Sequence, residues 1–156
     1  MNRLPSIVLT RAQASDADTV RALVRAAYAD WVPIFGREPL PMTTDYEVAV
    51  RDNEVDIATV GGQMVALIEM IVRADHIFIE NIAVLPDFQG GGIGRQLMAH
   101  AEARALSLGL PELRLLTGRV MDKNVRLYQA LGFQIDRTEP FMGGFTVYMS
   151  KTLVKA

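Results

Sequence analysis

The stretch Ile77–Leu108, IFIENIAVLPDFQGGGIGRQLMAHAEARALSL, has three successive parts: an apolar run, a glycine-rich turn and an amphipathic segment. The run Ile77–Val84 is rich in Ile, Val and Phe, which is typical of a buried strand, and Pro86 interrupts it. After the glycines, apolar residues recur with the period of a helix, at Ile93, Leu97, Met98, Ala101, Ala105 and Leu108. The sequence therefore predicts a strand, a glycine turn and a helix, with the glycines at the helix N-terminus.

This turn has the chemistry of an anion-binding site. A helix N-terminus offers unpaired N–H groups and partial positive charge, which suits a phosphate or pyrophosphate. Arg95 follows the turn and adds a formal positive charge. The plainer interpretation is a tight loop that uses positive φ angles, but four glycines exceed what a tight turn requires. The residues that would present their amides are Gln89, Gly90, Gly91, Gly92, Ile93 and Gly94.

Two common phosphate-binding patterns do not fit the turn. The pattern G-x-G-x-x-G would need glycine where the chain has Arg95 and Leu97, and the G-K-[ST] of a P-loop does not occur. The pattern that remains, Gln89-x-x-Gly92-x-Gly94 after a strand, resembles the signature motif of the GNAT superfamily of acyl-CoA N-acyltransferases. A later block resembles that family's L-Y-x-x-x-G-F motif: Asn124-Val-Arg-Leu-Tyr128-Gln-Ala-Leu-Gly132-Phe133.

The two blocks stand in the family's order, so the resemblance covers most of the chain and implies a fold. It implies a mixed α/β architecture with three α/β/α layers around a mostly antiparallel, splayed sheet. The element order read from periodicity and turn residues, β-α-α-β-β-β-α-β-α-β-β, agrees with it. The length of 156 residues, 50% of them hydrophobic, predicts a single N-acetyltransferase domain over residues 1–156.

The boundaries of the other elements come from apolar periodicity and turn residues. A capping box of Ser15 and Asp18 is expected to open a helix that runs to Trp31. Residues 33–41 predict an irregular loop, and Thr43 or Thr44 is expected to start a second helix. Further strands are predicted at 7–11, at 55–60 and 64–72 around a Gly-Gly hairpin, and at 113–116, 133–135 and 145–149, with a helix from Asp122.

Composition excludes several classes of function. A formal net charge of −2 without a long basic run argues against nucleic-acid binding. The sequence shows neither a signal peptide nor the ~18 successive apolar residues that suggest a membrane helix. There is no cysteine, hence no cysteine nucleophile, and the expected location is cytoplasmic. His76 and His100 lack metal-ligand spacing, so no metal is expected.

The resemblance also implies a reaction and a co-substrate. Family members move the acetyl group of acetyl-CoA to a primary amine by direct attack, without a covalent enzyme intermediate. By this resemblance the turn of residues 89–94, with Arg95, wraps the pyrophosphate. The backbone amides of Ile82, Ala83 and Val84 match those that hold the acetyl carbonyl. Many members carry asparagine where this chain has Met121, which leaves Asn124 as the candidate for contact with the pantetheine arm.

Two side chains are candidates for proton transfer. Glu80 lies in an otherwise apolar strand, where burial would raise its pKa toward the range of a general base. A salt bridge, or a strand edge that faces water, is the alternative for Glu80. Tyr128 matches the family tyrosine whose hydroxyl lies near the CoA sulfur. A core aromatic residue is the alternative for Tyr128, although a buried hydroxyl still needs a partner.

The acceptor side is less well defined by the sequence. Trp31 and Phe35 run into the proline-rich loop, where the family builds its acceptor wall, whereas Tyr28 is expected to pack in the core. The preferred acceptor is a small-molecule amine. A protein N-terminus or lysine is the alternative, as is a catalytically silent acyl-CoA-binding domain. The expected partner is thus a small amine or a peptide, not nucleic acid or a membrane, and a homodimer remains open.

Overall fold

The computed structural model describes residues 6–153 of the chain, which divide into two compact units. The first unit consists of residues 6–70 and 81–98, and the second consists of residues 71–80 and 99–153. The chain passes from one unit to the other within two strands and within one helix. The single domain over residues 1–156 stays a prediction.

Seven strands form a mixed sheet in the order β1-β2-β3-β4-β5-β7-β6. The pairs β1–β2, β2–β3, β5–β7 and β6–β7 are antiparallel and the pair β4–β5 is parallel, so the predicted mixed, mostly antiparallel α/β fold is confirmed. The strands are β1 Val8–Arg11, β2 Glu54–Val60, β3 Gln63–Val72, β4 Ile77–Val84, β5 Glu112–Gly118, β6 Gln134–Phe141 and β7 Gly144–Thr152. The helices are α1 Ala17–Tyr28, α2 Val32–Phe35, α3 Tyr46–Asp52, α4 Ile93–Ser107 and α5 Asp122–Ala130.

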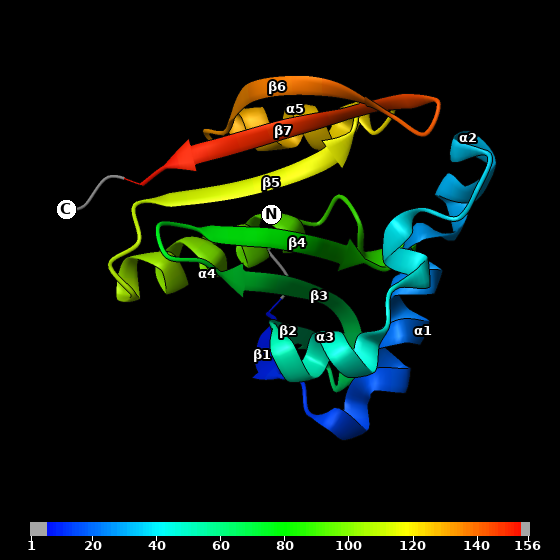
Figure 1. The fold of residues 1–156 in the computed structure, drawn as a ribbon. Coiled ribbons are helices and arrows are strands. Elements are labelled where there is room, and N and C mark those ends of the chain that lie inside the picture. The colour runs from blue at the N-terminus through cyan, green and yellow to red at the C-terminus, as the bar shows by residue number, and fades with distance from the viewer. Residues whose placement is uncertain (1–5, 154–156) are drawn as a thin grey trace. The chain divides into compact units, whose positions relative to one another are not determined.

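In the first unit, α1 and α3 pack on one face of the strands (Figure 1). Antiparallel pairing joins β1 to β2 and β2 to β3. The β2–β3 hairpin turns at Gly61 and Gly62, with φ angles of 56° and 81°, which favour glycine and match the right-handed strand twist. The shared core contains apolar side chains of α1, α3, β2, β3 and β4, among them Val20, Val24, Val50, Val55, Leu67 and Ala83.

The segment between α1 and α3 is more ordered than the sequence predicts. The expected irregular loop contains helix α2 and the 3-10 turn η3, Leu40–Thr43. Pro33 lies in the first turn of α2, where a missing N–H costs nothing, so it starts this helix instead of breaking it. The predicted start of the next helix was also wrong. Asp45 is its N-cap, and its carboxylate accepts hydrogen bonds from the amides of Glu47 and Val48.

The start of α1 also differs from the predicted capping box. The 3-10 turn η1, Ala14–Asp16, precedes the helix, and the Asp16 carboxylate accepts a hydrogen bond from the Gln13 amide at 2.8 Å. The reciprocal contact lies two residues earlier than expected. Asp16 follows Gln13 by three residues and Asp18 follows Ser15 by three residues, so both pairs fit the spacing of a capping box. The prediction used the second pair, and the structure uses the first.

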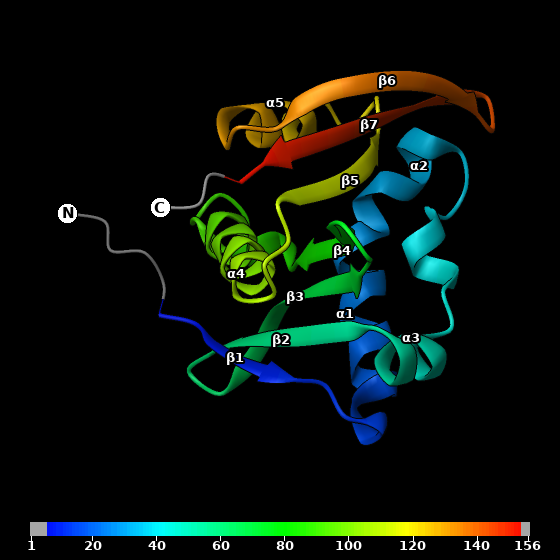
Figure 2. The ribbon, with the colours of Figure 1, turned by 60° about the vertical axis from the view of Figure 1, so that its left-hand side comes forward.

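In the second unit, β5, β7 and β6 form an antiparallel array with α5 beside it (Figure 2). Leu113, Leu115, Val147 and Met149 are buried, as is Phe133 before β6. The parallel pairing of β4 with β5 joins Ile77–Ile79 to Leu113–Leu115, at the beginning of both strands. The splaying of the sheet, which the family resemblance implies, stays a prediction.

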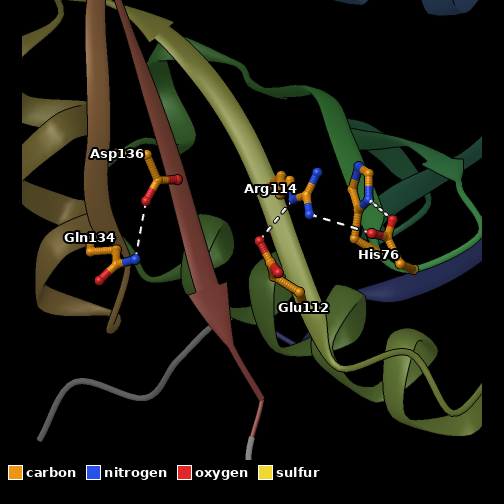
Figure 3. Close-up of polar contacts among 6 residues, drawn as sticks. His76, Glu112, Arg114, Gln134 and Asp136 are labelled. Carbon is orange, nitrogen blue, oxygen red and sulfur yellow. Dashed lines mark hydrogen bonds and ion pairs between the residues drawn. The ribbon is translucent and has the colours of Figure 1, made fainter.

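Charged side chains hold the turn before β4 to strand β5 in the second unit (Figure 3). The Arg114 guanidinium binds the Glu112 carboxylate at 2.8 Å and the Asp75 carboxylate at 3.6 Å. Asp75 also contacts His76 Nδ1 at 2.7 Å, and this hydrogen bond lowers the pKa of Asp75. Because Asp75 and Arg114 keep much of their contact with water, the cluster fixes geometry more than it adds stability.

Candidate active site

Strand β4 presents Glu80 on its more exposed face. Side chains alternate between the two faces of a strand, and every second residue from Ile77 to Ala83 is buried. Glu80 belongs to the opposite set and is exposed. The expectation of a buried carboxylate was therefore wrong, since half-buried Phe78 and Ile82 concealed the alternation in the sequence. The alternative of a carboxylate that faces water describes Glu80 better.

Neighbouring protein atoms nevertheless remove part of the water around this carboxylate. That desolvation raises the pKa of Glu80 above the usual glutamate value, while the positive charge of Arg73 acts in the opposite direction. Among residues 6–153, no ion pair ties Glu80 to a cation. The raised pKa makes the Glu80 carboxylate a stronger proton acceptor than an ordinary glutamate, which is the direction that a general base requires.

The end of β4 leads directly into the glycine turn, and two hydrogen bonds fix this junction. The Leu85 amide donates to the Val65 carbonyl at 2.9 Å, and the Gln89 side-chain amide donates to the Val84 carbonyl at 2.9 Å. Between them lies the 3-10 turn η4, Pro86–Phe88. The backbone of residues 82–84, predicted to hold the acetyl group, is thereby anchored at its C-terminal end.

The glycines of the turn differ in what their backbone requires. Gly90 and Gly92 have φ angles of 80° and 91°, so the tight-turn interpretation accounts for these two. Gly91 and Gly94 are absent from the positive-φ glycines of the described residues. Their φ angles do not require glycine, so a close approach by a ligand or by neighbouring protein atoms is the reason that remains for it.

Helix α4 begins where the glycine motif predicts. The Gln96 amide donates to the Gly92 carbonyl at 3.1 Å, so the helical hydrogen bonds start at Gly92. The amides of Ile93, Gly94 and Arg95 precede that first bond and have the orientation of an anion site. Arg95 is exposed beside them. Of the predicted apolar face, Leu108 is 41% exposed and was wrongly included, because the helix ends at Ser107.

Tyr128 lies in helix α5. Like Glu80 of strand β4, it belongs to the second unit. Its ring contacts that of Phe133, with 5.9 Å between centroids. The side chain is half-buried, and desolvation by the surrounding protein atoms raises the pKa of Tyr128 to about 12. Among residues 6–153, no hydrogen-bond partner of this hydroxyl is found. Tyr128 is therefore a neutral phenol with its proton available.

Asn124 also lies on α5, but its amide turns toward a sulfur atom. Its Nδ2 is 4.0 Å from the sulfur of Met121, and the Thr117 hydroxyl is 3.7 Å from the same sulfur. Met121 is buried at the start of the helix. A thioether accepts hydrogen bonds only weakly, so Asn124 keeps donor capacity for another ligand.

Trp31 and Phe35 lie in the first unit, on the segment between α1 and α3. Their rings meet edge to face, 6.3 Å apart, and both are half-buried. Arg25 braces this segment from α1: its guanidinium binds Glu38 at 2.8 Å and the Met42 carbonyl at 3.0 Å. Glu38, one of the acidic residues near the loop, is thus held by Arg25.

A buried polar network accompanies β4 that the sequence did not predict. Asn81 is 5% exposed, and its side chain contacts two tyrosine hydroxyls: Tyr28 at 2.7 Å and Tyr46 at 3.4 Å. Tyr28 packs against the core as expected, but it also has this polar contact. Since 35 or more residues separate the partners in sequence, no local pattern could indicate the network.

Comparison with known proteins identifies the class to which this fold and glycine turn belong. The model of the acetyltransferase (GNAT) family matches residues 20–133 of the chain. The chain therefore belongs to this family, and the predicted membership of the GNAT superfamily is confirmed.

Three relatives illustrate the range of the similarity. The thialysine N-epsilon-acetyltransferase of Bos taurus is 40% identical over 70 residues, which cover 43% of this chain and 39% of that enzyme. The ribosomal-protein-S18-alanine N-acetyltransferase of Escherichia coli is 21% identical with a TM-score of 0.78, covering 97% of this chain and 96% of that one. A GNAT acetyltransferase of Elizabethkingia anophelis, solved with acetyl-CoA bound, is 19% identical with a TM-score of 0.70, covering 94% and 98%.

No helix within residues 6–153 is long and apolar enough to cross a membrane.

Proposed function

We propose that this protein transfers the acetyl group of acetyl-CoA to the primary amine of a small molecule, by direct attack of the amine on the thioester. The observation that carries the proposal is the glycine turn at the N-terminus of α4, directly after β4, in a member of the GNAT family. Gly91 and Gly94, which do not need glycine for their φ angles, support a ligand that approaches the backbone closely.

Acetyl-CoA is bound through the first turn of α4 in this proposal. The amides of residues 90–94 hold the pyrophosphate, and Arg95 adds charge. The amides of Ile82, Ala83 and Val84 accommodate the acetyl carbonyl and stabilise the oxyanion that forms on it. Asn124 contacts the pantetheine arm. The solved structure of a relative with acetyl-CoA bound supports the choice of co-substrate.

Two proton transfers complete the reaction. The amine nitrogen forms a bond to the thioester carbon while Glu80, through a water molecule, takes a proton from that nitrogen. The carbon–sulfur bond then breaks, and Tyr128 donates its proton to the leaving sulfur, which gives free coenzyme A and the N-acetylated amine. The phenolate then regains a proton from solvent, and Glu80 releases to solvent the proton that it took. The raised pKa of Glu80 supports its role as a base, and the raised pKa of Tyr128 keeps the phenol protonated before the sulfur leaves.

A small amine is preferred over a protein as acceptor. The relative with 40% identity over its matching stretch is named for thialysine, a small amino acid with a primary amine on its side chain. A protein acceptor is the second candidate, because a relative with the same fold is named for an alanine of a ribosomal protein. Trp31 and Phe35 provide an apolar edge that suits the carbon chain of either acceptor.

Release of coenzyme A thiol tests the proposal. Acetyl-CoA is offered with thialysine, lysine, spermidine and a short peptide that begins with alanine. We expect turnover with one or more of the small amines and little with the peptide. Turnover with the peptide alone would indicate that the acceptor is a protein and not a small amine. Tight calorimetric binding of acetyl-CoA without turnover of any amine would indicate the catalytically silent domain.

A further inference from the structure

The side chains of Tyr28, Asn81 and Tyr46 form a continuous hydrogen-bond chain inside the first unit. The Tyr28 hydroxyl donates to Asn81 Oδ1 at 2.7 Å, and Asn81 Nδ2 donates to the Tyr46 hydroxyl at 3.4 Å. The Tyr46 hydroxyl in turn donates to the Pro41 carbonyl at 2.6 Å. Three elements far apart in sequence are thereby joined: the end of α1, the middle of β4 and the beginning of α3.

The direction of each proton requires an amide at position 81. A tyrosine hydroxyl has one proton, and that of Tyr46 is committed to the Pro41 carbonyl at 2.6 Å. Tyr46 must therefore accept from residue 81, while Tyr28 donates to it. Asparagine meets both demands, since it carries a donor and an acceptor. Aspartate could accept from Tyr28 but could not donate to Tyr46, and leucine could do neither.

The network encloses the segment that carries the candidate acceptor wall. Tyr28 is the last residue of α1, Tyr46 is the first residue of α3, and Trp31 and Phe35 lie between them. Both ends of the segment are thus tied to Asn81, and Arg25 adds a third attachment through Glu38 and the Met42 carbonyl. The position of residues 29–44 relative to β4 is fixed by side-chain hydrogen bonds, which a change in one hydroxyl can disturb.

The same network reaches the backbone that is proposed to hold the acetyl group. The Tyr28 hydroxyl lies 3.4 Å from the Ile82 carbonyl, in the residue directly after Asn81. Tyr46 is 1% exposed and Asn81 is 5% exposed, so bulk water does not replace a missing partner easily. An apolar core would hold α1, α3 and β4 together without the cost of burying these polar groups. Their presence therefore suggests a requirement for position.

We propose that Tyr28, Asn81 and Tyr46 are positioning residues for the acceptor amine: they hold the Trp31–Phe35 segment at a fixed distance from strand β4. This proposal rests on the proposed function, since it concerns the acceptor of that reaction. It assigns the network to acceptor binding and separates it from acetyl-CoA binding, which the glycine turn performs. Tyr28 and Tyr46 transfer no proton to or from the reactants.

Steady-state kinetics with thialysine as the probe test the assignment. Tyr28→Phe and Tyr46→Phe each remove one hydroxyl and keep the ring, and Tyr148→Phe is the matched control, a tyrosine of β7 that is stacked on Arg137 and lies outside the network. Loss of one hydrogen bond changes an equilibrium by about two- to tenfold. We expect KM for thialysine to rise about that much in both network variants, while KM for acetyl-CoA stays within about twofold.

A double variant and a conservative replacement sharpen the test. Since the network acts as one unit, Tyr28→Phe combined with Tyr46→Phe should raise KM for thialysine less than the product of the two single effects. Asn81→Asp should be at least as damaging as Asn81→Leu, because it leaves an ionised group that cannot donate to Tyr46. Equal increases in both KM values, or a lower melting temperature with unchanged KM values, would overturn the proposal.

Amide hydrogen exchange separates this proposal from the identity of the acceptor, because it needs no substrate. We expect faster exchange within residues 29–44 in Tyr28→Phe and Asn81→Leu, and parental exchange there in Tyr148→Phe. If thialysine is not acetylated, the choice of acceptor fails, and the exchange result still decides on the network. Parental exchange in residues 29–44 of both network variants would refute the positioning role.

Discussion

The side-chain amide of Gln89 donates a hydrogen bond to the backbone carbonyl of Val84, 2.9 Å away. This contact closes the 3-10 turn η4 and connects the last residue of β4 to the first residue of the glycine motif. Gln89 therefore acts through its side chain on the shape of the turn, while Gly90–Gly94 offer the amides. The side chain of Gln89 thus holds the glycine turn in shape by a hydrogen bond within the protein.

Replacement of Gln89 by Leu should weaken acetyl-CoA binding moderately. The lost hydrogen bond frees the Val84 carbonyl and lets η4 open, so an affinity decrease of about two- to tenfold is expected by calorimetry. Because Gln89 is exposed, the melting temperature without ligand should change little. Gln129→Leu, at an exposed position of α5, is the control. An unchanged affinity in the Gln89 variant would separate this hydrogen bond from cofactor binding.

A side chain at Gly94 should block acetyl-CoA more strongly. Gly94 lies in the first turn of α4 and has no positive φ angle, so Gly94→Val places bulk near the amides without backbone strain. Gly92 is a poorer test, because any substitution at a φ of 91° strains the turn itself. We expect acetyl-CoA affinity to fall tenfold or more.

Ala99→Val is the matched control for that variant, since it adds the same side chain at an exposed position of α4. It accounts for the helix propensity of valine and should leave acetyl-CoA affinity within about twofold. Equal affinities of both variants and the parent would remove the first turn of α4 from the cofactor site.

Glu80→Gln should lower kcat/KM while it preserves acetyl-CoA affinity. The pKa of Glu80 is raised, so activity of the parent should increase with pH through a value above the usual glutamate pKa. The deficit of the variant should shrink at high pH, where the amine is already neutral. The measurement is a pH profile of kcat/KM for both proteins. A parental profile in Glu80→Gln would exclude the general base.

The melting temperature gives an independent check on Glu80. A raised folded-state pKa means that ionisation of Glu80 destabilises the fold, so its stabilising contribution exists at low pH and is lost as pH rises through that pKa. At neutral pH the neutral glutamine should therefore not lower the melting temperature. A clear decrease would indicate a structural role for the carboxylate.

Local patterns in the sequence were sufficient for the elements that carry the glycine motif. The apolar run, the glycines and the helical period placed β4 and α4 to within a residue or two. The pattern failed at Glu80 and Pro33 for local reasons. Apolar residues on both faces hid the orientation of Glu80, and Pro33 occupies the one part of a helix that tolerates proline.

Long-range contacts set the limit of prediction at the candidate site. Asn81 pairs with tyrosines 53 and 35 residues away, and only the packing of α1 and α3 on the sheet brings these groups together. The shift of the Tyr128 pKa likewise depends on atoms that surround its hydroxyl, not on its neighbours in sequence. The sequence shows which side chains occupy these positions, but it does not show which groups they contact or how their pKa values shift.

Gly132→Ala should destabilise the protein through its backbone. Gly132 has a φ of 100°, and a Cβ there would lie 3.1 Å from Cε of Lys151, whose flexible chain can move aside. The strain of the positive φ angle costs about 1–2 kcal/mol, and the melting temperature should fall by about 2–8 °C. Gly144→Ala is the control, since its Cβ would meet an atom only at 3.8 Å. Similar melting temperatures of both variants would contradict the strain argument.

Tyr128→Phe removes one oxygen and keeps the ring that contacts Phe133 at 5.9 Å. If the phenol donates a proton to the leaving sulfur, kcat should fall by about 10²–10⁴. Acetyl-CoA affinity should change little, because the donated proton matters mainly in the transition state. Since the pKa of Tyr128 is about 12, its proton stays in place through neutral and moderately alkaline pH, and no alkaline loss of activity below pH 10 should arise from this group.

Single-turnover kinetics at saturating acetyl-CoA measure the effect on chemistry, and calorimetry measures affinity. Tyr148→Phe serves as the control, because its ring is stacked on Arg137 at 3.8 Å and it has no part in the proposed reaction. A Tyr128→Phe rate within threefold of the parent would assign Tyr128 to packing with Phe133. A large loss of kcat with unchanged affinity and melting temperature is the outcome that a general acid requires and that a core aromatic residue cannot produce.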